Sequence, residues 1–366
     1  MFIPNWRRRA GFNLYLVRAV AAILVLVAIL SLDGELRETS LELVRPGFFY
    51  MTGLTRYDFK PTPDEQACLD GTAVRINAPG MPRSIPRVAH FITGVSKPDP
   101  ATLLLWLAVR AAAVNLGPDG EIRLHYVYLS DEGPWWSGVR KLVTLVRHEP
   151  DFLNDFAHLA PSEWNPAHKA DVLRLQILRA HGGIYLDIDA IVLRPLDRLL
   201  SGRRDVVLGH EGGDRRGMAN AVILAKSAAP FLERWYRMYD GFDPRSWNYH
   251  SVILPAKLAD EYADEVCQLS PAAFFWPLWP TSHIEWMHAP LSPAESAAVA
   301  AAMARTNGSL FDEQLIYHAW NHAVARVIEH LTPRRIMVED TRFNMLVRRF
   351  VDVEPSLGQI QDEDRI

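Results

Sequence analysis

The 366-residue sequence is poor in cysteine and carries no surplus of positive charge. Its two cysteines, Cys68 and Cys267, exclude a disulfide-rich scaffold and a cysteine-type zinc site, while one bridge and two free thiols both remain open. Lys and Arg total 39 against 43 Asp and Glu, a net charge of −4 at pH 7. Because no excess of cations can neutralise a phosphate backbone, we expect no nucleic-acid partner. No repeat of about 20–50 residues is present, which excludes a solenoid.

The composition is that of an ordinary globular protein. Hydrophobic residues make up 49% of the chain and charged residues 22%, enough to build a sizeable core. The length fits one large domain with appendages, or two domains. We predict a cytosolic tail and signal anchor at residues 1–34, a stem at 35–84, a globular domain at 85–330 and a C-terminal tail at 331–366.

The N-terminal segment has the pattern of a membrane anchor. Arg7, Arg8 and Arg9 precede a largely apolar stretch, residues 11–32, and basic residues before an apolar run favour a cytosolic N-terminus. A cleaved signal peptide is the alternative, but no A-x-A site follows the stretch. The expectation is therefore a single-pass type II membrane protein.

Strand and helix patterns alternate through the middle of the chain. Short apolar runs predict strands at residues 88–92, 122–129, 184–186, 206–209 and 221–225. Helical patterns with start and stop signals lie at residues 101–113, 166–181, 230–239 and 251–262. This alternation predicts an α/β fold with a mostly parallel sheet flanked by helices.

Two acidic residues follow one of these strands. If the strand continues through Asp187, Ile188 and Asp189, both carboxylates point to one side and Ile188 points into the core. Paired carboxylates form a hard-oxygen site suited to Mn²⁺ or Mg²⁺. The pair would also lie at the carboxyl ends of the strands, where open α/β sheets bind ligands.

The preceding helix brings further charges to the same place. Asp171 and Arg174 are three residues apart and share a helix face, and Gly182-Gly183 lets a ligand approach the backbone closely. Taken singly, these features are more often a solvated turn, a surface ion pair and a helix stop. Their occurrence together within residues 171–189 favours a functional site.

The segment 168–189 resembles a known motif. It reads HKADVLRLQILRAHGGIYLDID, and it is similar to the DXD sugar-binding region of glycosyltransferase family 32. The same D-x-x-R…G-G-x-Y-x-D-x-D block occurs in α-1,4-galactosyl- and α-1,4-N-acetylglucosaminyltransferases and in the large clostridial glucosylating toxins. Segments 85–92 and 317–321 resemble the first strand and the closing motif of that fold, so the resemblance covers about residues 85–325.

The resemblance implies a GT-A fold, which is Rossmann-like, and a metal-dependent hexosyltransferase that retains anomeric configuration. Its donor would be a UDP- or GDP-sugar and its acceptor a glycan or glycolipid, as in glycosphingolipid biosynthesis. The implied metal ligands are Asp187, Asp189 and His318, and the implied catalytic residues are Asp187, Asp189 and Arg174. The implied donor contacts are Phe91, Asp171, Arg174, Tyr185, Asp187 and Trp320.

Parts of the family pattern are missing, and other functions remain open. Thr93 stands where the toxins carry a tryptophan near the nucleobase, so the nucleotide is open. A D-x-D after a strand also occurs in haloacid-dehalogenase-type phosphatases, although Ile191 occupies the fifth position here. A catalytically inactive glycan-binding or scaffold protein is the non-enzymatic alternative.

The acceptor side and the compartment depend on weaker signals. Glu211 and Asp214 are the carboxylates we would test as acceptor groups. The tryptophans of Trp135-Trp136 and of segment 276–280 fit a platform for a sugar or lipid acceptor, although buried core is the favoured interpretation. Asn307-Gly308-Ser309 is an N-glycosylation sequon. With the anchor, it would fit a Golgi protein if the source is eukaryotic.

Overall fold

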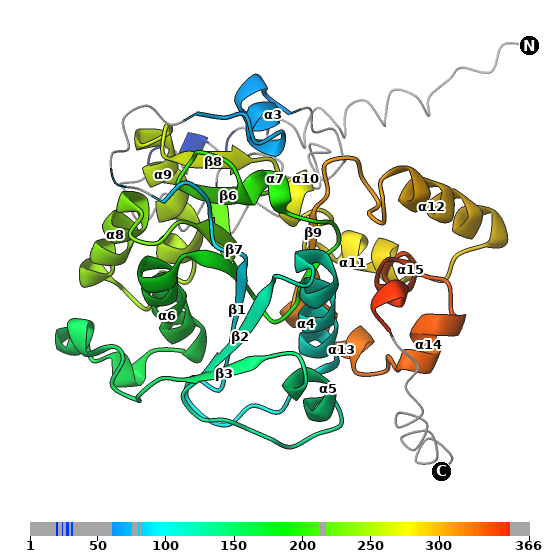
Figure 1. Cartoon of the computed structure of the whole chain (residues 1–366), viewed down its shortest axis with the longest axis horizontal. Coiled ribbons are helices and arrows are strands. Elements are labelled where there is room, and N and C mark those ends of the chain that lie inside the picture. The colour runs from blue at the N-terminus through cyan, green and yellow to red at the C-terminus, as the bar shows by residue number, and fades with distance from the viewer. Residues whose placement is uncertain are drawn as a thin grey trace, which may run out of the picture. The chain divides into compact units, whose positions relative to one another are not determined.

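A computed structural model describes residues 61–74, 80, 82–212, 215 and 217–351, together with Val20, Leu24, Val27, Ala28 and Ser31 (Figure 1). The chain divides into two compact units, Met1–Arg56 and Tyr57–Ile366, and the fold below is that of the second. The unit is an α/β structure with helices on both faces of a central sheet, as predicted.

The central sheet has seven strands in the order β3-β2-β1-β4-β7-β6-β8. All neighbouring strands are parallel except that β7 runs antiparallel to both β4 and β6. Because β7 is reversed, its N-terminal part reaches the sheet edge at which β4 ends. The strands are β1 (Val88–Thr93), β2 (Glu121–Tyr126), β3 (Thr144–Arg147), β4 (Gly183–Leu186), β6 (Val206–Glu211), β7 (Gly217–Ala225) and β8 (Val266–Leu269).

A second, two-stranded sheet joins the middle of the chain to its C-terminal part. Strand β5 (Ala190–Val192) pairs antiparallel with β9 (Ile316–His318), and Ala190 lies opposite His318. This pairing is not evident from the sequence, because the two strands are short and far apart in the chain. It positions His318 next to the residue that follows the acidic pair.

Two hydrophobic cores cover the two faces of the large sheet. The side chains of β4 alternate between them: Ile184 and Leu186 face the core that contains α4 (Leu103–Leu116), whereas Tyr185 faces the core built with α6 (Pro166–His181). The second core also contains α8 (Pro230–Arg237) and α9 (Leu254–Glu261). The remaining α-helices among the described residues are α3 (Pro63–Leu69), α5 (Trp136–Arg140), α7 (Asp197–Leu200), α10 (Pro271–Phe274), α11 (Thr281–His288), α12 (Pro293–Arg305), α13 (Asn321–Ile328), α14 (Pro333–Val338) and α15 (Arg342–Val347).

Local sequence signals set both ends of α6, the helix that carries Asp171 and Arg174. The Asn165 side chain accepts a hydrogen bond from the backbone N–H of Ala167, and Pro166 occupies the first helical position. The helix ends at Gly182, which has a φ of 65°. These signals explain why the predicted bounds, 166–181, agree with the structure.

Gly182 and Gly183 are required by neighbouring backbone. A Cβ on Gly183 would lie 2.6 Å from the Val88 carbonyl oxygen of β1, and a Cβ on Gly182 would lie 2.6 Å from the Ser227 nitrogen. Both residues also have positive φ, which glycine adopts without strain. We expected a ligand to lie close to the backbone of these glycines, but neighbouring segments of the protein occupy that space.

The predicted single-pass type II topology has to be corrected. In the part of the chain that the structure describes, no helix combines the length and the apolarity needed to cross a bilayer. The clean apolar run after Arg18 covers only residues 19–30, fewer than the ~20 residues that a spanning helix needs. The tail 1–10 and most of segment 11–32 lie outside the described residues. The Golgi placement depended on this topology and is not carried further.

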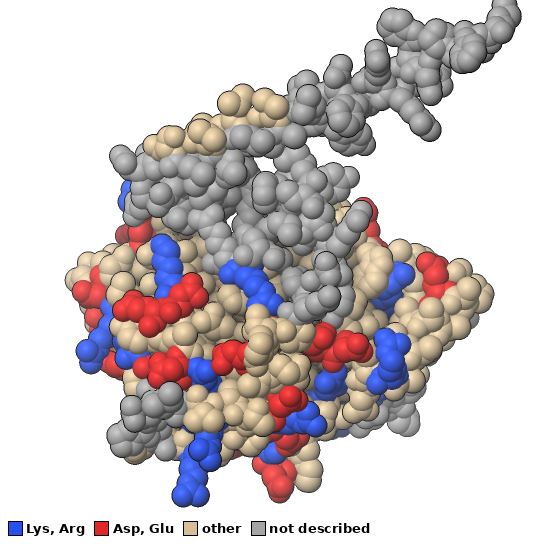
Figure 2. Space-filling model, turned by 90° about the horizontal axis from the view of Figure 1, so that it is seen from above, with Lys and Arg blue, Asp and Glu red and all other residues tan. Residues whose placement is uncertain are grey.

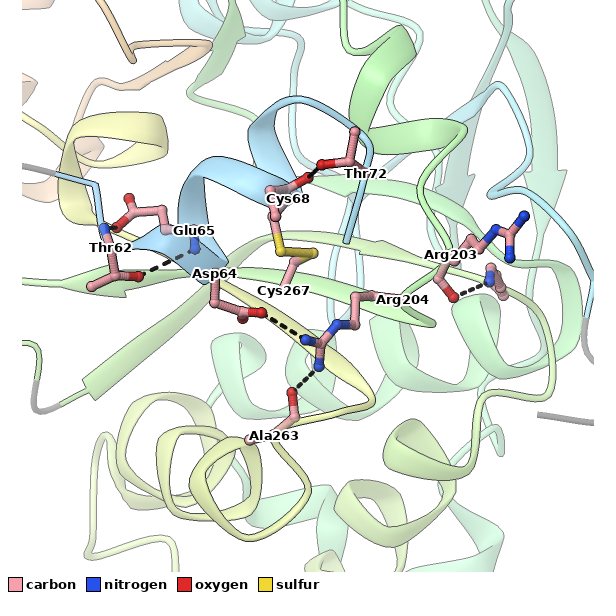
Figure 3. Close-up of a disulfide and its surroundings, with 11 residues drawn as sticks. Thr62, Asp64, Glu65, Cys68, Thr72, Arg203, Arg204, Ala263 and Cys267 are labelled. Carbon is pink, nitrogen blue, oxygen red and sulfur yellow. Dashed lines mark hydrogen bonds and ion pairs between the residues drawn. A yellow bond between two sulfur atoms is a disulfide. The ribbon is translucent and has the colours of Figure 1, made fainter. Parts of the chain in front are cut away.

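A disulfide joins Cys68 of α3 to Cys267 of β8, two residues separated by 199 positions (Figure 3). The sequence left open whether the two cysteines are bridged or free, and the structure shows that they are bridged. Thr62 caps α3 by accepting a hydrogen bond from the backbone N–H of Glu65, and the Glu65 carboxylate accepts one from the Thr62 N–H. An ion pair of 2.7 Å between Asp64 and Arg204 also joins α3 to the segment that precedes β6. Part of the segment predicted as a stem is thus held against the edge strand β8.

Part of the segment predicted as a C-terminal tail is also folded. Residues 333–350 include α14 and α15, and Ile336, Phe343 and Phe350 are fully buried in the core that contains α4. Residues 352–366 lie outside the described part. On the coloured part of the face in Figure 2, acidic and basic side chains are interspersed, so neither sign dominates there.

Candidate active site

The acidic pair lies in a turn between β4 and β5. The Asp187 N–H donates to the Ala221 carbonyl of β7 (2.8 Å), and the Ala190 N–H donates back to the Asp187 carbonyl (2.9 Å). The strand alternation that we used to predict convergence therefore ends at Leu186. The carboxylates still converge, but because the chain turns between them. Ile188 is half-buried at the periphery of the core.

Asp187, Asp189 and His318 each offer a ligand atom, and these three atoms lie within 4.8 Å of one another. The His318 Nε2 atom is 3.2 Å from Asp189 Oδ1 and 4.0 Å from Asp187 Oδ2. The other oxygen of Asp189 accepts a hydrogen bond of 2.7 Å from the Asn321 N–H. The structure therefore brings together the three residues predicted as metal ligands.

The charges of these three groups are interdependent. Burial raises the pKa of Asp187 above its ordinary value despite the nearby Arg174. Burial would do the same to Asp189, but His318 and the Asn321 N–H outweigh it and lower the pKa of Asp189. For His318, burial alone would lower the pKa, but the carboxylates of Asp189, Asp187 and Glu211 outweigh burial and raise it. In the absence of a cation, His318 thus partly neutralises the acidic pair.

Arg174 organises the neighbouring cluster. Its guanidinium lies 3.0 Å from Asp171 Oδ1 and 3.2 Å from Asp187 Oδ1. It also lies over the Tyr185 ring, 4.4 Å from the centroid, while the Tyr185 hydroxyl donates a 2.6 Å hydrogen bond to Asp187 Oδ1. Burial alone would lower the pKa of Arg174, but Asp187 and the other acidic groups outweigh burial and raise this pKa. The cation is therefore permanent and links the helix α6 to the acidic pair.

Asn220 belongs to this cluster, although the sequence analysis missed it. Its Oδ1 accepts a 2.9 Å hydrogen bond from Arg174, and its Nδ2 donates a 2.8 Å bond to Asp171 Oδ1. Its own backbone carbonyl accepts from Arg174 as well (2.8 Å). A lone asparagine inside an apolar strand is the only local signal that could have identified it.

An irregularity in β7 directs Asn220 toward Arg174. Leu208 of β6 pairs with Ile223, but His210 pairs with Met218, so Gly209 alone lies opposite residues 219–222. Such a bulge breaks the two-residue alternation and re-aims a side chain, as is common near active sites. Gly209 is needed opposite it, because a Cβ there would lie 2.8 Å from the Phe274 ring.

The other predicted residues fall in different places. Trp320 is half-buried, and its ring lies edge-on to His318 with centroids 4.4 Å apart. Phe91 is not brought to the cluster: it is fully buried in the core that contains α4, on the face opposite Tyr185.

The predicted acceptor groups are also distributed differently. Glu211 accepts a 3.0 Å hydrogen bond from Trp279 Nε1, whereas Asp214 lies outside the described residues. Trp276 is buried, as favoured, but Trp279 is only half-buried. Trp135 and Trp136 are partly buried and pack against the core.

The fold and the site together define a class of protein. An acidic pair, a histidine and a buried arginine converge where β4 ends in a mostly parallel sheet, which is where α/β enzymes bind phosphorylated ligands through a cation. A model of the glycosyltransferase sugar-binding region containing the DXD motif matches residues 114–205, which include α6 and the acidic pair.

Two relatives were found by sequence comparison. Glucan organizing enzyme 1 of Cryptococcus neoformans var. grubii serotype A is 34% identical over 287 residues, which cover 73% of this chain and 71% of the relative. The uncharacterized protein At4g19900 of Arabidopsis thaliana is 23% identical over 178 residues, covering 46% of this chain and 26% of the relative. The chain belongs to the family of glycosyltransferases with a DXD-containing sugar-binding region, and it is a glycosyltransferase.

Solved structures with a similar fold are distant. The PaToxG glycosyltransferase matches 84% of this chain and 98% of its own, with 16% identity and a TM-score of 0.37. The galactosyltransferase LgtC, solved with donor and acceptor sugar analogues, matches 74% of this chain and 99% of its own, with 16% identity and a TM-score of 0.34. Similarity at this level does not assign a substrate.

Proposed function

We propose that this glycosyltransferase transfers a hexosyl or N-acetylhexosaminyl group from a nucleotide-sugar to a glycan acceptor, with retention of anomeric configuration. The observation that carries the proposal is the convergence of Asp187, Asp189 and His318, whose ligand atoms lie within 4.8 Å of one another. Retention and the family 32 type follow from the resemblance of segment 168–189 to that family. Donor hydrolysis and product analysis can test both.

The chemistry of the donor set fits a divalent cation. Two carboxylates supply the hard oxygens that Mn²⁺ and Mg²⁺ prefer, and the imidazole of His318 favours Mn²⁺, because Mg²⁺ is bound mainly through oxygen. His318 and the Asn321 N–H lower the pKa of Asp189 against the effect of burial, and this keeps the carboxylate ionised. Asp187, Asp189 and His318 would hold the ion, which would stabilise negative charge on the departing diphosphate.

The neighbouring cluster supports binding of the donor sugar. Asp171 and Asn220 present a carboxylate and an amide that can bond sugar hydroxyls, and Arg174 fixes the position of both. Tyr185 fixes the Asp187 carboxylate by donating to Oδ1, which leaves Oδ2 for the ion. Of the predicted donor contacts we retain Asp171, Arg174, Tyr185, Asp187 and Trp320.

The proposed reaction is a same-face displacement. The acceptor oxygen forms a bond to the anomeric carbon while the bond from that carbon to the diphosphate breaks, and the hydroxyl proton passes to a phosphate oxygen. Arg174, which pairs with Asp187, would add fixed positive charge on the donor side of the cluster. The reaction needs no carboxylate nucleophile, and the sequence provides no convincing one.

The relative's name suggests the first acceptors to test. Glucan organizing enzyme 1 is named for glucan, so short glucans come first, ahead of glycolipid acceptors. UDP-glucose, UDP-galactose, UDP-N-acetylglucosamine and GDP-mannose are incubated with the protein with and without Mn²⁺, and free sugar is measured. We expect slow cation-dependent hydrolysis of one donor. Hydrolysis of phosphomonoesters instead would indicate a phosphatase, and no turnover of any donor would indicate an inactive glycan-binding protein.

A further inference from the structure

Glu211 lies on the His318 side of the metal-ligand cluster. It is the last residue of β6, and Trp279 donates a hydrogen bond to it. Pro277, two residues before Trp279, accepts a hydrogen bond from Trp320, whose ring lies against His318. Arg174, Asp171 and Asn220 instead gather around Asp187. Glu211 is half-buried, so its carboxylate combines exposure with a fixed position. A donor sugar held by Asp171 and Asn220 would leave this side of the cluster for a second substrate.

Two tryptophans border the same region. Trp279 donates the 3.0 Å hydrogen bond that fixes Glu211 Oε1, and Trp320 donates from Nε1 to the Pro277 carbonyl (2.8 Å). The Trp320 ring lies edge-on to His318, with centroids 4.4 Å apart. Both tryptophans are half-buried. The segment 277–279 thus connects the two rings next to the predicted metal ligands.

This combination has the chemistry of a saccharide subsite. A carboxylate accepts charge-assisted hydrogen bonds from sugar hydroxyls, and a tryptophan ring provides a flat apolar surface for the C–H face of a pyranose. Small-molecule sites in general combine aromatic walls with a few fixed polar groups.

We infer that Glu211 and Trp279 form the subsite that binds the acceptor saccharide. Glu211 contacts an acceptor hydroxyl, and Trp279 fixes Glu211 through its N–H and presents its ring to the pyranose. The inference rests on the proposed transferase function and adds to it the class of acceptor and the residues that recognise it. It also assigns a role to half-buried aromatic surface that donor binding does not use.

The test compares transfer with hydrolysis for three variants. Donor hydrolysis is measured without acceptor, and transfer is measured with β-1,3-glucotriose and α-1,4-glucotriose as the probes. Glu211→Gln should raise the acceptor KM about ten-fold, the effect of losing one charged hydrogen bond, and lower the ratio of transfer to hydrolysis. Trp279→Phe keeps a ring but removes the N–H, so it should give a smaller change in the same direction. Glu339→Gln, which alters an exposed carboxylate paired with Arg335, is the matched control and should change neither rate.

The outcomes separate the two proposals. An acceptor KM in Glu211→Gln equal to that of the wild type overturns the subsite, and so does an equal loss of hydrolysis and transfer. A wild-type protein that hydrolyses its donor but transfers to neither glucotriose also contradicts the subsite. If the wild type hydrolyses no nucleotide-sugar at all, the proposed function itself fails.

Discussion

The Asn321 backbone N–H donates a 2.7 Å hydrogen bond to Asp189 Oδ2, so the segment after β9 holds one oxygen of the second acidic residue. The other oxygen faces His318 Nε2 at 3.2 Å. The geometry of Asp189 thus depends on two residues more than a hundred positions away in the chain. Any change at Asp189 affects the cation site and this link together.

Asp189→Asn should reduce Mn²⁺-dependent donor hydrolysis at least 100-fold, because an amide is a poor ligand for a hard cation and the site loses one negative charge. The far-UV circular dichroism spectrum should remain that of the folded protein. Asp197→Asn is the control, since that carboxylate is exposed and pairs with Arg87 away from the cluster. Wild-type rates in Asp189→Asn would contradict the role assigned to this residue.

Mn²⁺ affinity should fall as the pH is lowered. His318 must be neutral to bind a cation, and although burial opposes it, Asp189 and Asp187 raise the pKa of His318 above its ordinary value of 6.5 in the cation-free protein. Protonation therefore competes with the metal below that raised pKa, by up to about ten-fold in Kd per pH unit. Isothermal titration calorimetry across about pH 5.5–8 measures the effect. His318→Asn should flatten this dependence, and an unchanged slope would argue against His318 as a ligand.

Three histidines on the α6 face of the sheet should make the protein sensitive to acid. His90 Nε2 contacts the Gly182 carbonyl (2.9 Å), and hydrogen bonds of 2.9 and 2.8 Å join His90 to His125 and His125 to His148. The carbonyl can only accept, so His90 Nε2 carries a proton and the tautomers of the chain follow. Burial lowers the pKa of His90 to about 4 and that of His125 to about 2.

These groups stay neutral in the folded protein but take up protons on unfolding below their ordinary pKa of 6.5. The free energy of unfolding therefore falls as the pH decreases from 6.5, and the His90 contribution levels off below about 4. His90→Gln should reduce the slope between about pH 6 and 5 by up to roughly 1.4 kcal/mol per pH unit in urea titrations. His330→Gln, at an exposed position, should leave the slope unchanged. An equal slope in His90→Gln and the wild type would refute this account.

Loss of the Cys68–Cys267 disulfide should lower the free energy of unfolding by about 2–4 kcal/mol, because the bridge closes a long loop in the unfolded chain. The double variant Cys68→Ala/Cys267→Ala and the reduced wild type should have the same lowered urea midpoint. The reductant should have no further effect on the double variant. A reductant effect of equal size in both proteins would show that the bridge is not its target.

The residues that could be predicted from the sequence are those whose signals are local. Helix α6, its two glycines and the acidic pair lie within residues 166–189, where capping, helical periodicity and spacing each act over a few positions. His318 was found only through the resemblance, because β9 is too short to be recognised from its own pattern. The convergence of the acidic pair was predicted for the wrong reason, since a turn and not a strand produces it.

The residues that were missed come from elements far apart in the chain. Asn220 contacts Arg174 only because β7 runs antiparallel to its neighbours and pairs with β6 in an irregular register. Neither property can be predicted from a short stretch of sequence. The histidine chain requires β1, β2 and the residue after β3 to be neighbours in a particular register. Strand order and register depend on tertiary packing, which periodicity alone does not determine.

The bulge in β7 has a consequence for how such an enzyme can change over time. On its β4 side the strand keeps regular pairing from Leu186↔Val222 to Gly183↔Ala225, and the Ala221 carbonyl accepts from the Asp187 N–H, so residues 219 and 220 lie outside these bonds. Insertions or deletions there would move the amide of Asn220 relative to the acidic pair without unravelling the sheet. Donor preference could therefore diverge through backbone length at this point, while the packed interior and the metal ligands stay as they are.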